Sequence, residues 1–155
     1  MAAVLDHVNV VVAEIERSVA FYSRLLGLAV IMDRVLDGPW FETLAGIPGA
    51  RARCVILDAP GGGCRVELLR FEDADGAPLP ANSLPATIGL RHFALRVDDL
   101  DSTLAVLAAG FGQEVAPVEV PHHIVKGGKR MAYVRDPDGA VVELAQYGAA
   151  TPEFL

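Results

Sequence analysis

The chain has 155 residues, of which 52% are hydrophobic and 21% are charged, and this balance is typical of a globular domain rather than a disordered chain. The 20 acidic and 13 basic residues give a formal net charge of -7, and the basic residues are scattered, so we expect no nucleic-acid partner. No stretch approaches the roughly 18 consecutive apolar residues of a spanning helix, and Asp6 and His7 interrupt the N-terminal apolar residues, so we expect a cytoplasmic protein that contacts no membrane.

The first half of the chain combines one helix-like segment with several strand-like segments. Residues 5–12 (LDHVNVVV) are rich in β-branched side chains with a period of two, which predicts a strand. Residues 15–26 repeat apolar side chains every three to four positions, which predicts an amphipathic helix that ends at Gly27. Three more strands are predicted between turns rich in Gly and Pro, at residues 28–35, 51–57 and 64–71. The order is therefore β-α-β-β-β.

The same pattern restarts after a segment that we interpret as a connection, residues 72–89, which contains three prolines. Written under residues 6–27 at a constant offset of 85, residues 91–112 repeat the strand and helix positions in the same order. The tripeptide Val-Glu-Leu also recurs near the end of each half, at residues 66–68 and 142–144. Two matched copies are the simplest explanation.

We therefore predict an α+β fold with two tandem βαβββ modules that form a cup-shaped mixed sheet around a metal site. The predicted boundaries are residues 1–71 for the first module, 72–89 for the connecting segment, 90–148 for the second module and 149–155 for a C-terminal tail. The two cysteines, Cys54 and Cys64, have no CxxC spacing, so we expect neither a zinc cluster nor a disulfide.

A histidine opens the first predicted strand of each module, and a glutamate lies in the last. These residues are His7 and Glu67 in the first module and His92 and Glu143 in the second. If the repeated strands curl around one cavity, they bring together two nitrogen and two oxygen donors, a set that suits Mn, Fe, Co, Ni or Zn. A lone strand histidine is more often a surface residue, but a glutamate flanked by apolar residues is costly unless it is paired or coordinated.

These motifs resemble the vicinal oxygen chelate superfamily, which contains glyoxalase I, methylmalonyl-CoA epimerase, extradiol dioxygenases and bleomycin-binding proteins. The resemblance covers roughly residues 5–147 and is carried by DHVNVVV, SVAFYSRLLGL, RVELL, RHFALRVDDLD and RDPDGAVVELAQ. It implies that His7, Glu67, His92 and Glu143 bind one divalent metal ion, either Ni, Co, Fe, Mn or Zn. It also implies a homodimer.

The reaction that the resemblance implies is proton transfer next to a carbonyl of a small oxygenated substrate, by an isomerase, an epimerase or a glyoxalase-like lyase. Glu143 is the first choice for the catalytic base and Glu67 the second. Bacterial glyoxalase I has a glutathione-binding Arg where this chain has Val11, and an Asn where it has Phe71, which weighs against a glutathione hemithioacetal as substrate. Methylmalonyl-CoA epimerase is similar in length, although it usually has Gln at the position of Glu67.

Two other functions stay open. Extradiol dioxygenases bind iron through two His and one Glu, and a fourth protein ligand leaves fewer positions for catechol and dioxygen. Bleomycin-binding relatives sequester a natural product, and they usually lack the metal ligands. Residues that we consider for substrate binding lie on predicted strands, in the first-module insertion and in one loop: Asn9, Trp40, Phe41, His122, His123 and Arg130. For Trp40 and Phe41, ordinary packing is an equal alternative.

Overall fold

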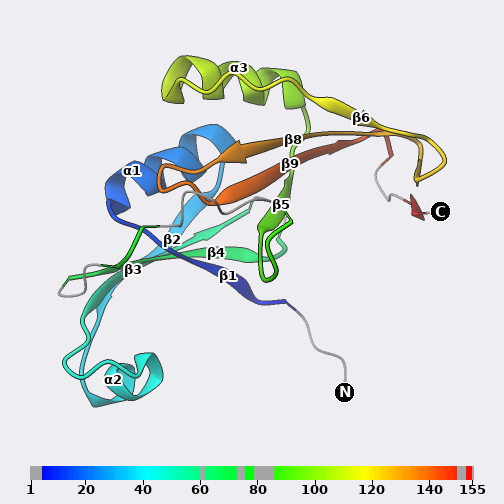
Figure 1. The fold of residues 1–155 in the computed structure, drawn as a ribbon. Coiled ribbons are helices and arrows are strands. Elements are labelled where there is room, and N and C mark those ends of the chain that lie inside the picture. The colour runs from blue at the N-terminus through cyan, green and yellow to red at the C-terminus, as the bar shows by residue number, and fades with distance from the viewer. Residues whose placement is uncertain (1–4, 60–61, 73–75, 79–85, 150–152, 155) are drawn as a thin grey trace. The chain divides into compact units, whose positions relative to one another are not determined.

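Two four-stranded sheets organise the chain in the computed structural model (Figure 1). The structure describes residues 5–59, 62–72, 76–78, 86–149 and 153–154. The chain divides into two compact units, residues 1–79 and 80–155, and each unit contains one of the four-stranded sheets. In the described part of the chain no helix is long and apolar enough to cross a membrane.

The first unit contains a mixed sheet with the strand order β1-β4-β3-β2. Strand β1 runs parallel to β4, and the other neighbouring strands are antiparallel. The strands are β1 (His7–Val11), β2 (Ala29–Leu36), β3 (Ala52–Asp58) and β4 (Arg65–Phe71). Each of the four strands predicted for the first module is present.

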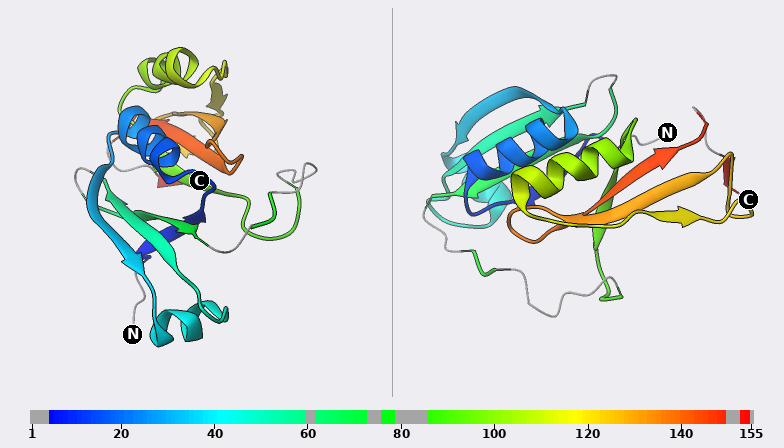
Figure 2. Two further views of the ribbon diagram at one scale, coloured as in Figure 1. Left: turned by 90° about the vertical axis from the view of Figure 1, so that its left-hand side faces the viewer. Right: turned by 90° about the horizontal axis from the view of Figure 1, so that it is seen from above.

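The predicted helix of the first module is present and covers one face of this sheet (Figure 2). It begins as α1 (Ile15–Ala20) and continues as a short π-helical segment, η1 (Phe21–Leu25). Ile15, Phe21 and Tyr22 are at most 1% exposed, so the apolar stripe seen in the sequence lies in the core. The helix thus covers one face, and the opposite face holds His7 and Glu67.

A second helix of the first unit, α2 (Pro39–Ala45), was not predicted. Its sequence carries the standard boundary signals, with Pro39 in the first turn and Gly46 in the left-handed conformation at the C-cap. Its buried residue Phe41 packs with Ala50, Ala52 and neighbouring apolar side chains, and these residues form a small satellite core. The expectation of a single helix in this module was therefore wrong.

The second unit repeats the architecture with the strand order β5-β9-β8-β6, in which β5 runs parallel to β9. One helix, α3, packs against β9 (Figure 2). The elements are β5 (His92–Arg96), α3 (Leu100–Phe111), β6 (Val118–Val120), β8 (Lys129–Arg135) and β9 (Val141–Tyr147). A two-stranded sheet, which was not predicted, pairs β7 (Val125–Lys126) with β10 (Glu153–Phe154) in the C-terminal segment.

The two sheets share one strand order, one set of directions and one register. Glu67 is the third residue of β4 and lies opposite Asn9, while Glu143 is the third residue of β9 and lies opposite Ala94. In each unit the histidine lies two residues before that partner, on the same face of the sheet. The predicted α+β class with tandem βαβββ modules is confirmed. In the connecting segment 72–89, the described residues are in neither helices nor strands.

Candidate functional site

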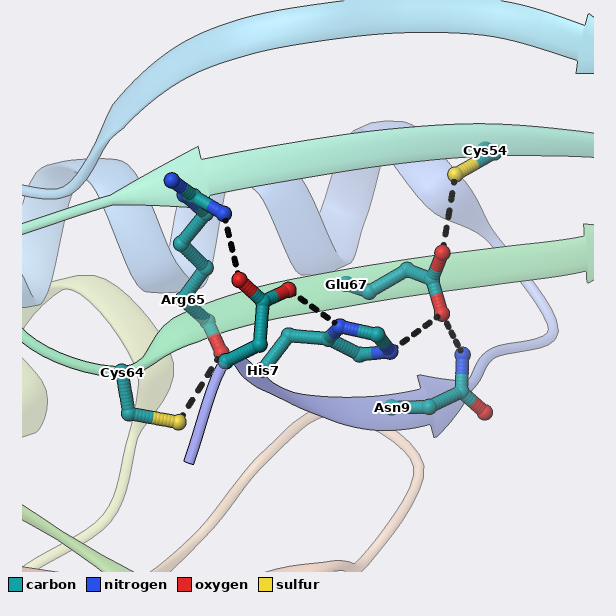
Figure 3. Close-up of polar contacts among 7 residues, drawn as sticks. His7, Asn9, Cys54, Cys64, Arg65 and Glu67 are labelled. Carbon is teal, nitrogen blue, oxygen red and sulfur yellow. Dashed lines mark hydrogen bonds and ion pairs between the residues drawn. The ribbon is translucent and has the colours of Figure 1, made fainter. Parts of the chain in front are cut away.

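His7 and Glu67 form a pair on the face of the first sheet that α1 does not cover (Figure 3). His7 Nε2 lies 3.6 Å from Glu67 Oε2. The side chain of Glu67 is 18% exposed and that of His7 is 44% exposed, so the pair is open to solvent mainly through the imidazole. The pair brings together the two residues that the sequence analysis assigned to the first module.

Asp6 orients the imidazole of His7. Its Oδ2 lies 2.9 Å from His7 Nδ1, and Arg65 Nη1 donates to Asp6 Oδ1 at 3.0 Å. The hydrogen bond with His7, followed by the positive charge of Arg65, lowers the pKa of Asp6 below its usual value. Because ionised Asp6 only accepts hydrogen bonds, Nδ1 of His7 is the donor in this contact, and Nε2 is the ring nitrogen nearer to Glu67.

Glu67 accepts hydrogen bonds from two neutral groups. Asn9 Nδ2 donates to Oε2 at 2.9 Å, and the Cys54 thiol donates to Oε1 at 3.4 Å (Figure 3). Burial, together with the nearby charge of Glu67, raises the pKa of Cys54 to about 12, so this thiol stays protonated and acts as a donor. Asn9, predicted as a substrate-binding residue, is thus a direct partner of the proposed metal ligand.

His92 and Glu143 form the corresponding pair in the second unit. His92 Nε2 lies 3.3 Å from Glu143 Oε2, and the imidazole packs against Tyr133 with the ring centroids 4.9 Å apart. Glu143 is buried, with 6% of the residue exposed. The structure therefore brings His92 close to Glu143, as it brings His7 close to Glu67, each pair inside its own unit, while the meeting of all four residues around one metal ion stays a prediction.

Lys129 is the residue of this region that the sequence analysis missed. Its Nζ lies 2.6 Å from Glu143 Oε1, and its side chain is only 12% exposed. Burial favours the neutral amine, but the hydrogen bond to Glu143 and the negative charge of that carboxylate raise the pKa of Lys129 above its usual value. The sequence gives only the alternation of Lys129 with Met131 and Tyr133, which places these three side chains on one face of β8, and the register of β8 against β9 then brings Lys129 to Glu143.

Each pair has the donor types and the spacing for two neighbouring positions around a metal ion. Two ligand atoms at bond lengths of about 2.1 Å and angles between 90° and tetrahedral lie about 3.0–3.4 Å apart. The 3.3 Å separation in the second unit lies inside this range, and the 3.6 Å separation in the first is slightly wider. Among the described residues, no group of three or more His, Cys, Asp or Glu side chains is close enough to hold a metal. Each pair therefore fits as part of a ligand set.

The second unit also contains an open cavity of about 260 Å³ beside the end of β9. His122, Lys129 and Tyr147 contribute to its lining, together with the backbone-only residues Gly127 and Gly128. Lys129 thus binds Glu143 and also contributes to the lining of the cavity. His123 is exposed in the same turn as His122 but does not line the cavity.

Three other predicted substrate residues lie in distinct environments. Arg130 also contributes to the lining of this cavity, and its two terminal nitrogens bind the carboxylate of Asp101 of α3 at 2.8 Å. Phe41 is 3% exposed and stacks on Phe71 with a centroid distance of 5.9 Å, which is ordinary core packing. Trp40 beside it is 57% exposed.

Comparisons with known proteins identify the family. The family model of the glyoxalase/bleomycin resistance protein/dioxygenase superfamily matches residues 4–144. The chain belongs to this superfamily. The uncharacterized protein YwkD of Bacillus subtilis is 29% identical over 140 residues, which cover 90% of this chain and 94% of that protein. A probable chloroplastic lactoylglutathione lyase of Arabidopsis thaliana is 29% identical over 151 residues, which cover 96% of this chain but only 37% of that protein.

Solved structures share the fold. A glyoxalase family protein from Bacillus cereus superposes with a TM-score of 0.76 at 22% identity, covering 96% of this chain and 97% of that one. The trypanothione-dependent glyoxalase I of Leishmania major superposes with a TM-score of 0.60 at 22% identity, covering 94% of this chain and 87% of that one. At this level of identity the likeness establishes the fold and leaves the reaction to the residues of the site.

Proposed function

We propose that this protein is a metal-dependent enzyme that catalyses proton transfer next to a carbonyl of a small oxygenated substrate, as an isomerase, an epimerase or a glyoxalase-like lyase. The observation that carries the proposal is the recurrence of a histidine–glutamate pair at the same register of both sheets. In each unit the pair lies on the sheet face away from the helix.

The proposed ligands of one divalent metal ion are His7, Glu67, His92 and Glu143. The separations of 3.6 Å and 3.3 Å within the two pairs support this assignment, as does the carboxylate behind His7, an arrangement common for metal-binding imidazoles. The four ligands come either from one chain or from two copies of it. Mixed nitrogen and oxygen donors suit Ni, Co, Fe, Mn or Zn.

Glu143 is the proposed base, and Glu67 is the second candidate. A bound divalent ion supplies positive charge beside the substrate oxygens, which makes the neighbouring carbon-bound proton more acidic. Glu143 is buried, so little water competes for its carboxylate, and its Oε2 is the oxygen that does not bind Lys129. This oxygen accepts the proton and returns it to the substrate.

The substrate that we propose is small and lacks a glutathione moiety. Val11, where bacterial glyoxalase I has a glutathione-binding Arg, is an exposed apolar residue on the same strand face as His7 and Asn9. Phe71, at the position of the family's Asn, lies in the satellite core against Phe41. Asn9 and His122 are the proposed polar contacts to the substrate, because they neighbour Glu67 and line the cavity of the second unit, respectively.

Exchange of a carbon-bound proton in deuterated water tests the proposal. Metal-loaded protein should exchange the α-proton of a member of a panel of 2-hydroxy ketones, 2-oxo thioesters and thiohemiacetals, as followed by proton NMR. Glu143→Gln should abolish the exchange while part of the metal remains bound. Arg34→Gln, which removes a charge from β2, is a matched control and should leave the exchange unchanged.

The contrary outcome assigns the protein to another class. Tight binding of a bulky natural product by the metal-free protein, unchanged in Glu143→Gln and without turnover, would make it a sequestering protein of the bleomycin-binding type. Cleavage of a catechol ring with consumption of dioxygen would make it a dioxygenase. Full metal retention in both His7→Ala and His92→Ala would exclude the four-residue ligand set.

We also propose that the protein is a cytoplasmic homodimer. Strand β2 is an edge strand and exposes Val30, Ile31 and Val35, which are 43–55% exposed and would be covered in a dimer. A monomeric mass by light scattering at high protein concentration would contradict the dimer without affecting the proposed chemistry.

Both cysteines are free, which suits a reducing compartment.

A further inference from the structure

The two carboxylates proposed as metal ligands have different partners. In the first unit Glu67 Oε1 accepts from the neutral thiol of Cys54, at 3.4 Å. In the second unit Glu143 Oε1 binds the ammonium group of Lys129, at 2.6 Å. Both members of the second contact are largely buried, with 12% and 8% of their side chains exposed, so solvent screens this attraction weakly.

The register of the sheets shows that this difference is built into the second unit. Lys129 lies opposite Tyr147 on β9. The residue opposite Glu143 is Tyr133, four positions further along β8 than Lys129. The corresponding position of the first sheet is Ala52, which lies opposite Phe71 and belongs to the satellite core under α2. The first unit therefore has an alanine at the position from which Lys129 reaches its carboxylate.

We propose that Lys129 is a positioning residue that makes Glu143 the weaker and more readily released of the two carboxylate ligands. This inference rests on the proposed function. The positive charge of the ammonium group at Oε1 reduces the electron donation of the Glu143 carboxylate to a metal ion. Asn9 and Cys54, the hydrogen-bond donors to Glu67, are neutral, so they reduce the electron donation of that carboxylate less.

The surroundings of Lys129 also hold the released carboxylate in place. When Glu143 leaves the metal ion, its charge stays paired with the ammonium group, so release does not leave a bare charge in a buried site. The ammonium group lies 5.4 Å from the centroid of the Tyr147 ring, which offers a second favourable contact. Lys129 also contributes to the lining of the open cavity of the second unit.

The test measures metal affinity rather than activity. Chelator-stripped protein is titrated with Co²⁺ against a chromophoric chelator. Lys129→Met should bind Co²⁺ roughly tenfold more tightly than the wild type, because Glu143 loses a cation that competes with the metal ion for its charge. Lys126→Met is the charge-matched control, since Lys126 pairs with Glu153 on the surface and should change the affinity less than twofold.

Double variants assign the effect to Glu143. In a Glu143→Gln background, Lys129→Met should have no effect on Co²⁺ affinity. In the wild-type background, Glu67→Gln should weaken binding more than Glu143→Gln does, and this difference should vanish in Lys129→Met. A Lys129 residue that only supported the fold would, when replaced, lower the affinity.

The outcomes separate this inference from the proposed function. Equal or weaker Co²⁺ binding by Lys129→Met, in a protein whose affinity depends on His7 and His92, would overturn the inference and leave the ligand set intact. Affinity that is unchanged in His7→Ala and His92→Ala would overturn the ligand set, and with it the assignment of Glu143 as the weaker of two carboxylate ligands. Absence of Co²⁺ binding in every variant would overturn both.

Discussion

Asp6 Oδ2 lies 2.9 Å from His7 Nδ1, and this contact fixes which ring nitrogen faces Glu67. The second unit differs at the equivalent position, because the residue before His92 is Arg91, whose Nε donates to the carbonyl of Leu90. An arginine side chain cannot accept a hydrogen bond from an imidazole. The two histidines of the repeat are therefore oriented by different contacts. In the first unit the residue before the histidine is Asp6, which provides a carboxylate for Nδ1, whereas in the second unit it is Arg91.

Replacement of Asp6 should weaken metal binding without removing a ligand. Asp6→Asn is expected to lower the affinity for Co²⁺ roughly tenfold, because the amide holds the imidazole less firmly and does not increase its basicity as a carboxylate does. Isothermal titration of the chelator-stripped protein provides the measurement. Asp37→Asn removes the same charge at the Arg51 ion pair and serves as the control. Equal affinities of the two variants would contradict the orienting role of Asp6.

The strands and the contact between histidine and glutamate in each unit could be predicted because both depend on local sequence patterns that occur in both halves of the chain. A period of two places His7 and Asn9 on one face, and the recurrence of Val-Glu-Leu fixes the equivalent strand in the other half. Parallel pairing of the first and last strands of each module then brings histidine and glutamate together. A lone histidine in either half would not have carried this prediction.

The partners of those pairs could not be predicted, because they depend on contacts between strands whose register a single sequence does not give. Lys129 reaches Glu143 only because β8 and β9 pair in a register that places it diagonally across the sheet. Cys54 reaches Glu67 for a similar reason. Helix α2 was missed because its seven residues are too few for the periodicity of an apolar stripe to appear.

Phe41 should contribute to stability and Trp40 should not. Phe41 is 3% exposed and packs in the satellite core, so Phe41→Ala should lower the free energy of unfolding by about 3–5 kcal/mol. Trp40→Ala is the matched control from the same turn of α2, and the exposure of its side chain predicts a change of less than about 0.5 kcal/mol. Urea denaturation measures both. A large loss in Trp40→Ala with none in Phe41→Ala would contradict this assignment.

Asp99 should stabilise the second unit in a pH-dependent way. Its side chain caps α3 by accepting from the backbone N–H of Ser102 at 3.1 Å and from the Ser102 hydroxyl at 2.6 Å, and these hydrogen bonds lower its pKa. Asp99→Ala should lower the melting temperature by about 2–4 °C at pH 7.

The sign of the pH dependence follows from the lowered pKa of Asp99. Its stabilising effect is fully present above the unfolded pKa of about 3.9 and is lost as the pH falls through the lower folded value. The difference in melting temperature between wild type and Asp99→Ala should therefore be constant from pH 7 to pH 5 and shrink below pH 4. Asp98→Ala, which removes the neighbouring exposed carboxylate, is the control. A difference in melting temperature between the wild type and Asp99→Ala that grows in acid would contradict the capping role of Asp99.

Cys54 should be protected from alkylation in the native protein, whereas Cys64 should react. Cys54 is fully buried, and burial together with the charge of Glu67 raises the pKa of its thiol to about 12, so almost no thiolate is present at pH 8. Burial also raises the pKa of Cys64, but that side chain is partly accessible. Mass spectrometry after treatment with iodoacetamide at pH 8 should find one modified cysteine in the native wild type and two in urea. In Cys64→Ser the native protein should stay unmodified, and modification of Cys54 at the rate found in urea would show that its thiol is neither buried nor held against Glu67.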